Sequence, residues 1–202
     1  WRLGVDVPGL DEIDAWTLPA NVQYAWPHPH RRLLYVASSD GGTRHGPLGT
    51  RHHVTVFEVD AGSGRLAVVG EPLSLPGRPI HLTVDPAGTH ILVAFPRPSA
   101  LRVYGIKPDG SPGEEVPQPK PVELGNYVHQ VRVTADGKHL LVPELGGNPF
   151  QGRPEDPGGL NLFGYADGAV GARQVVAPNG GFGFGPRHVD LHSNGRWVYV
   201  SL

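Results

Sequence analysis

The chain has 202 residues, of which 17 are basic and 19 are acidic, so its formal net charge is −2. Because no block of like charge stands out, the composition argues against a nucleic-acid or membrane-surface partner, and no apolar run approaches the ~20 residues that a membrane helix needs. The chain contains no cysteine, which excludes a disulfide framework and a thiolate metal site and suits the reducing cytoplasm, where we expect the protein to act.

One pattern occurs four times along the chain: an apolar strand, a tight turn and a second apolar strand. The copies start at Val22, Ile80, Val128 and Arg187, and their closing strands are about 57, 49 and 58 residues apart. Self-similarity at this period indicates a repeat architecture, in which one unit cannot bury its own apolar face and stacks on its neighbours.

In chain order, the segment after each of the first three copies reads as a further strand pair. The runs VTVFEV (54–59) and LRVYGI (101–106) alternate with period two, which predicts half-buried antiparallel strands. Asp-Gly and glycine-rich turns separate such runs and account for many of the 29 glycines. No stretch has the 3.6-residue apolar period of a surface helix, so little helix is predicted.

Four antiparallel strands in each repeat predict an all-β protein, a β-propeller of four-stranded blades. We treat residues 1–202 as one domain, in which residues 1–20 supply outer strands of the blade that closes the ring. Because three and a half blades do not close a ring, we expect this chain to be a piece of a longer propeller. The predicted blades cover residues 22–73, 79–121 and 128–178 and, as a half blade, 186–202.

Strand alternation predicts that the loops of such a protein lie on two opposite faces. The turns inside the strand pairs are short and share one face, whereas the other face gathers the long loops 39–51 and 146–158 and the glycine-rich segment 179–185. Long loops on a rigid scaffold commonly carry binding groups, so the second face is the predicted site face.

An alignment of the copies on their turns places Gln23, Ile80, His129 and Arg187 at one position, where the innermost strand starts at the mouth of a central channel. A histidine can exchange protons near neutral pH, and a guanidinium can hold an anionic group or a developing oxyanion. His129 and Arg187 are therefore candidate catalytic residues. The alternative is a structural role, in which both side chains satisfy backbone groups between blades.

Other residues with reactive or polar side chains support no further site. The 11 histidines lack the clustered spacing of a zinc site, so no metal is predicted. His81 and His188 share one blade position and are interpreted as hydrogen-bonding residues between blades. Glu144 and Asp156 lie at the site face, either as solvated loop charges or as carboxylates of the site. No βα unit follows the GFGFG run (181–185), so no dinucleotide or other cofactor is predicted.

Three segments resemble the lactonase family of seven-bladed propellers, which includes bacterial 6-phosphogluconolactonases and a fungal carboxy-muconate cyclising enzyme. The most specific is GFGFGPRHVDLHSNGRWVYVSL (181–202), with its Gly-Pro-Arg-His block and its His-x-Asn-Gly turn. The segments YVHQVRVTADGKHLLVPELG (127–146) and GRPIHLTVDPAGTHILVA (77–94) are similar to two further strand and turn signatures of the family. The resemblance covers about residues 22–202.

The resemblance implies a catalytic histidine, arginine and glutamate at the channel mouth. His129 and Arg187 match the first two, and the glutamate is expected directly after Leu202. Tyr127 departs from the family pattern, because many relatives have a histidine there, which implies a different substrate range. We assign substrate binding to Gln23, His188, Glu144 and Gly185.

The implied activity is enzymatic hydrolysis of a sugar-derived lactone, with 6-phosphogluconolactone as the leading substrate. The expected partner is thus a small-molecule lactone or an anionic sugar acid. Arg187 and backbone N–H groups of residues 181–186 would stabilise the oxyanion, and His129 would act as general base or acid. Two alternatives stay open: lactonising isomerisation of a muconate-like diacid on the same fold, and a non-catalytic propeller that serves as a binding platform.

Overall fold

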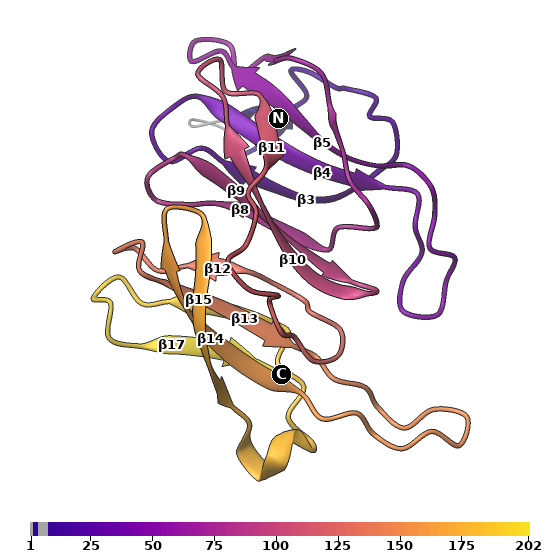
Figure 1. Ribbon diagram of the computed structural model, residues 1–202. Coiled ribbons are helices and arrows are strands. Elements are labelled where there is room, and N and C mark those ends of the chain that lie inside the picture. Colours follow the sequence, from indigo (N-terminus) through magenta and orange to yellow (C-terminus); the bar gives the residue numbers. More distant parts are fainter. Residues whose placement is uncertain (1, 4–7) are drawn as a thin grey trace.

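The computed structural model describes residues 2–3 and 8–202, which form antiparallel strands, turns and one short 3-10 helix, η1 (Pro178–Gly181). The strands make three large sheets that follow one another along the chain, together with two strand pairs (Figure 1). No helix in the described part of the chain is long and apolar enough to cross a bilayer.

The sheets are composed as follows. The first contains β3 (Asn21–Pro27), β4 (Leu33–Ser39), β5 (His52–Val59), β6 (Leu66–Val68) and β7 (Leu73–Ser74). The second contains β8 (His81–Val84), β9 (His90–Pro96), β10 (Ser99–Ile106) and β11 (Pro112–Glu115). The third contains β12 (Arg132–Val133), β13 (His139–Glu144), β14 (Gly159–Ala166) and β15 (Ala169–Val176). The two pairs are β1 (Arg2–Leu3) with β2 (Leu10–Asp11) and β16 (His188–Leu191) with β17 (Val198–Ser201).

Except for β6 and β7, strands that are consecutive in the chain are neighbours in each large sheet, with antiparallel registers throughout. The fourth position of the first sheet is split, because β6 and β7 both pair with β5. Two residues between β6 and β7 interrupt the pairing with β5: Gly70, with φ +64°, and Pro72, which has no N–H to donate. The predicted all-β architecture of four-stranded antiparallel sheets is confirmed.

The sequence predicts that the first twenty residues supply outer strands of a closing blade. Residues 1 and 4–7 of this segment lie outside the described residues. In the remainder, β1 and β2 pair with each other, and Trp16 packs edge-on against Phe57 of the first sheet at a centroid distance of 5.5 Å. The assignment of this segment to a closing blade stays a prediction.

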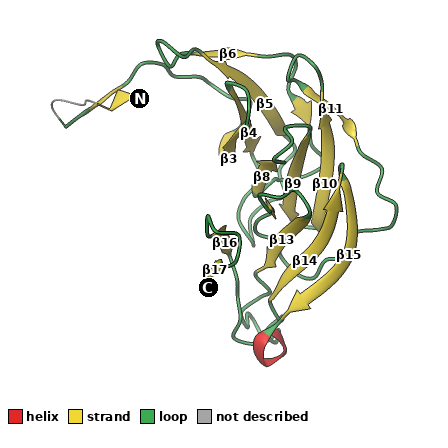
Figure 2. Ribbon diagram, turned by 90° about the vertical axis from the view of Figure 1, so that its left-hand side faces the viewer, coloured by secondary structure: helices red, strands yellow, loops and turns green. Residues whose placement is uncertain are grey.

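The three large sheets stack in chain order, and β3 and β8 lie along the same edge of the stack (Figure 2). At this edge β8 contacts both β3 and β12. The period-two alternation explains this stack. Ile91 and Val93 of β9 are buried against the first sheet, whereas Leu92 and Ala94 of the same strand are buried against the third. β9 thus contributes to two cores, and the sheets depend on their neighbours for burial.

Candidate functional site

The loops of the stacked sheets lie on two opposite faces. On one face, the short turn between β3 and β4 reaches the second sheet, where Arg31 donates a hydrogen bond of 3.1 Å to the carbonyl of Asp109. The loops 39–51 and 146–158 lie at the other ends of the strands and contact each other there. Residues that precede the innermost strands are also at this end of the sheets.

His129 and Arg187 are held at the ends of neighbouring sheets by backbone hydrogen bonds. The His129 N–H donates to the carbonyl of Pro143 at 3.0 Å, and its side chain is buried, at 9% exposure. The Arg187 N–H donates to the carbonyl of Ser201 at 2.9 Å, which places Arg187 directly before β16. Both residues are therefore fixed where their strands start.

A direct contact joins these two sheets. The rings of His129 and His188 pack edge to face, with centroids 4.8 Å apart and an interplanar angle of 86°. Next to them, the buried side-chain carbonyl of Gln130 accepts the Val189 N–H at 2.6 Å, which fixes β16 against the third sheet. The structure thus brings His129, His188 and Arg187 together, while their chemical roles stay predictions.

Burial and nearby positive charge lower the pKa values of His129 and His188. Burial lowers the pKa of His129 to about 4, assisted by the positive charges of His188 and Arg187 and opposed by a hydrogen bond to the Arg187 backbone. The pKa of His188 is also lowered, first by burial and then by Arg187. A neutral imidazole can accept a proton, and the Nδ1 atom of His129 is buried without a hydrogen-bond partner in the described part of the chain.

His81 differs from its sequence interpretation. It was expected to form hydrogen bonds between blades, yet neither ring nitrogen has a partner among the described residues, and the side chain is 1% exposed. It lies between aromatic rings of β3, with centroids 4.0 Å from Tyr24 and 5.8 Å from Trp26. Burial lowers the pKa of His81 to about 3, with smaller contributions from the nearby charges of Arg132, His188 and His129.

Arg132 is a residue of this region that the sequence reasoning missed. Its guanidinium carbon lies 4.9 Å from the ring centroid of Trp26 in the first sheet, and it forms a 3.3 Å ion pair with Asp190 on β16. Arg132 therefore spans from the first sheet to the last strand pair. In the sequence, only its position three residues after His129 indicates that Arg132 lies near the site, since no sequence pattern links it to Trp26.

Gln23 and Gly185 have mainly local contacts. The Gln23 amide donates to the carbonyls of Asn21 (3.1 Å) and Ser39 (3.4 Å) at the end of the first sheet. Gly185 passes close to Leu145, since an added Cβ would lie 3.4 Å from it. The N–H groups of Phe182, Gly183 and Phe184 are already hydrogen-bonded, whereas the N–H of Gly185, two residues before Arg187, has no hydrogen-bond partner within the described residues.

Glu144 is not brought to the histidine cluster. It pairs with Val128, so its side chain lies on the sheet face opposite to that of His129. Its carboxylate accepts the Gly125 N–H at 2.6 Å and lies 3.7 Å from the Arg173 guanidinium. Burial raises the pKa of Glu144. Its contacts are those of a structural group, and its role in substrate binding stays a prediction.

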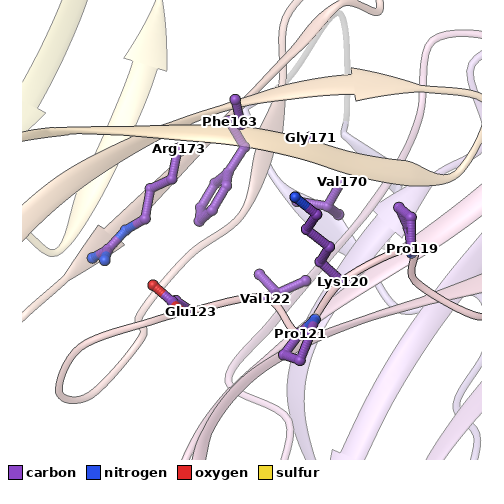
Figure 3. Close-up of a pocket in the computed structure, with 10 residues that line it drawn as sticks. Pro119, Lys120, Pro121, Val122, Glu123, Phe163, Val170, Gly171 and Arg173 are labelled. Atoms are coloured by element: carbon purple, nitrogen blue, oxygen red, sulfur yellow. The ribbon is translucent and has the colours of Figure 1, made fainter.

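A hollow of about 550 Å³ lies beside β14 and β15 (Figure 3). One of its wall residues, Phe163, pairs with Leu140, four residues before Glu144 on β13, so the hollow is on the same face of the third sheet as Glu144. Its walls are the connection from Pro119 to Glu123 and the side chains of Phe163, Val170 and Arg173. Phe163 belongs to the core between the second and third sheets, so this hollow is a seam between sheets, on the face of the third sheet opposite to that of His129. Across the described residues, no group of three or more histidine or acidic side chains could hold a metal ion.

Comparisons with known proteins agree with this architecture. A family model described as Lactonase, 7-bladed beta-propeller, matches residues 8–202. The 6-phosphogluconolactonase of Klebsiella pneumoniae (strain 342) is 28% identical over 200 residues, which are 98% of this chain and 53% of that protein. The 6-phosphogluconolactonase of Erwinia tasmaniensis is 29% identical over 191 residues, which are 94% of this chain and 49% of that protein. The chain spans about half the length of the curated relatives that it matches.

Solved structures share the fold. A protein from Lactobacillus plantarum has a TM-score of 0.67 at 20% identity, with 98% of this chain and 55% of that chain covered. The periplasmic gluconolactonase of Pseudomonas aeruginosa has a TM-score of 0.60 at 20% identity, with 98% and 70% covered. At such identity the likeness concerns the fold alone, and it confirms the predicted propeller architecture.

Proposed function

Because the chain belongs to the lactonase family of seven-bladed β-propellers, we propose that it contributes the active site for hydrolysis of a sugar-derived lactone, with 6-phosphogluconolactone as the leading substrate. The observation that carries the proposal is the cluster of His129, His188 and Arg187 at the starts of the inner strands. The curated relatives named above are 6-phosphogluconolactonases, which supports this choice of lactone.

The ester carbonyl carbon of the lactone is the reacting atom. His129, as a neutral base, takes a proton from a water molecule that attacks this carbon. Negative charge then develops on the carbonyl oxygen, and the Arg187 guanidinium and the free N–H of Gly185 stabilise it. The Arg187 side chain is exposed and makes no ion pair within the described residues, so its donors are available. When the ring C–O bond breaks, His129 returns the proton to the leaving oxygen.

The test is a rate measurement on the full-length protein with 6-phosphogluconolactone, in which proton release above the spontaneous rate is followed. We expect His129→Gln to lower kcat/KM at least about 100-fold, as for the loss of a general base, and Arg187→Ala to lower it at least about tenfold. The rate should fall with decreasing pH only near pH 4, because His129 must be neutral.

The control is Arg65→Gln, which removes one charge from an exposed turn on the opposite face and should leave the rate unchanged. Wild-type activity in the folded His129→Gln variant would contradict the proposal. Formation of a lactone from a muconate-like diacid, without hydrolysis of the sugar lactone, would favour the isomerase alternative instead.

A further inference from the structure

Two long loops that are about 100 residues apart in the sequence meet across the second sheet. The His45 ring stacks on Phe150 with centroids 4.4 Å apart and an interplanar angle of 18°, and the Arg44 guanidinium donates to the carbonyl of Gly146. From the second sheet, Arg97 donates to three carbonyl groups of the first loop. The loops are thus held in one arrangement by specific contacts.

An open hollow with an excess of positive charge lies beside the two loops. Its volume is about 600 Å³, and its charged lining consists of Arg44, Arg97, Arg153 and Asp156. The lining thus contains three arginines and one aspartate. In the described part of the chain none of these arginines lies within 4 Å of a carboxylate, and Arg153 makes no side-chain hydrogen bond. Because each guanidinium carries five N–H donors, most of them remain available to a ligand.

Tyr127 connects this hollow to the catalytic cluster. The Arg44 guanidinium carbon lies 4.7 Å from the Tyr127 ring centroid, and that ring is 6.4 Å from the His129 ring. Tyr127 has φ +60°, which is rare for a bulky side chain. Its N–H donates to the Ser99 hydroxyl at 2.8 Å, and its carbonyl accepts the Leu145 N–H at 3.0 Å. Such fixed, unfavourable conformations cluster at ligand-binding sites.

We propose that the hollow between the two loops is an anion subsite for the phosphate group of the substrate, with Arg44, Arg97 and Arg153 as its ligands. Guanidinium groups match the geometry of phosphate oxygens through paired N–H donors. His129 and Arg187 act on the lactone carbonyl, and the phosphate at the other end of the sugar lies beyond Tyr127, in the hollow. The substrate class rests on the proposed function, while binding of phosphate by the arginines does not.

The experiment compares 6-phosphogluconolactone with unphosphorylated gluconolactone as substrates of the full-length protein. Arg153→Gln is the main variant, because the Arg153 side chain makes no hydrogen bond within the described residues. We expect it to raise KM for the phosphorylated lactone about tenfold, with kcat and the KM for gluconolactone unchanged, as for loss of one charge-assisted contact. Arg65→Gln on the opposite face should change neither substrate.

A direct binding measurement separates this proposal from the proposed function. Inorganic phosphate should bind to the wild-type protein and about tenfold more weakly to Arg153→Gln, by calorimetry, even if neither lactone is hydrolysed. Equal effects of Arg153→Gln on both lactones, or phosphate affinity that the substitution leaves unchanged in a folded variant, would overturn the anion subsite. Loss of lactone hydrolysis alone would overturn only the proposed function.

Discussion

At the scale of single residues, His81 is the least expected feature of the molecule. A buried imidazole that lacks hydrogen-bond partners within the described residues costs about 1–3 kcal/mol of stability, because its polar atoms lose water without compensation. Its ring is nevertheless well packed against Tyr24 and Trp26. The surrounding side chains therefore pack against the flat ring of His81 but form no hydrogen bonds with its nitrogens.

We therefore predict that His81→Phe leaves the free energy of unfolding at pH 7 unchanged or raises it by about 1 kcal/mol, since it keeps an aromatic ring and removes the unpaired polar atoms. Urea unfolding measures this. A loss of more than about 2 kcal/mol would show that the ring nitrogens have a stabilising partner.

The same variant should change the pH dependence of stability. The pKa of His81 is about 3 in the folded chain and near 6.5 in an unfolded chain. Between these values the unfolded state binds more protons, so this contribution to stability is complete above about pH 6.5 and is lost as the pH falls. Between pH 7 and pH 5 the wild type should lose about 2 kcal/mol more than His81→Phe.

At the scale of strands and turns, tyrosine hydroxyls tie each sheet to a turn of its neighbour. Tyr165 of β14 donates to the Asp85 carboxylate at 3.1 Å, and Tyr35 of β4 donates to the Gly110 carbonyl at 2.9 Å. Both acceptors lie in turns of the second sheet. The second sheet is therefore hydrogen-bonded to the first sheet on one side and to the third sheet on the other. The bond to Asp85 has a charged acceptor, whereas the bond to Gly110 is neutral.

This pair of tyrosines allows a matched comparison. Tyr165→Phe should lower the free energy of unfolding by about 1.5–3 kcal/mol, and Tyr35→Phe by about 0.5–1.5 kcal/mol, because hydrogen bonds to charged groups are stronger. Urea unfolding of both variants gives the two values. A larger loss for Tyr35→Phe would mean that the charge of Asp85 does not strengthen its bond to Tyr165.

At the scale of the whole molecule, stability comes from the apolar layers between successive sheets. Phe163 is 2% exposed in the layer between the second and third sheets, whereas Phe182, near η1, is 49% exposed. Phe163→Ala should cost about 3–5 kcal/mol, through lost burial and the cavity that remains, and Phe182→Ala less than about 0.5 kcal/mol. Similar losses in the two variants, measured by thermal or urea unfolding, would contradict the layered core.

The sequence by itself determined the sheet order and the location of the predicted catalytic pair. Period-two alternation and the turns with Gly88, Gly137 and Gly195, all at positive φ, specify where strands start and end, because glycine adopts this conformation without strain. The repeat alignment then placed His129 and Arg187 at equivalent strand starts, and the structure holds them on neighbouring sheets.

Only the tertiary structure decided which of the remaining polar residues meet. Alternation shows that side chains point to two faces of a strand, but not which neighbouring sheet each face contacts. It therefore could not predict that Glu144 lies apart from the histidine cluster, or that the His81 ring has no hydrogen-bond partner within the described residues. Contacts such as Arg132 with Trp26, or His45 with Phe150, join residues about 100 positions apart. They depend on how whole sheets pack on one another, and no local pattern of the sequence encodes that packing.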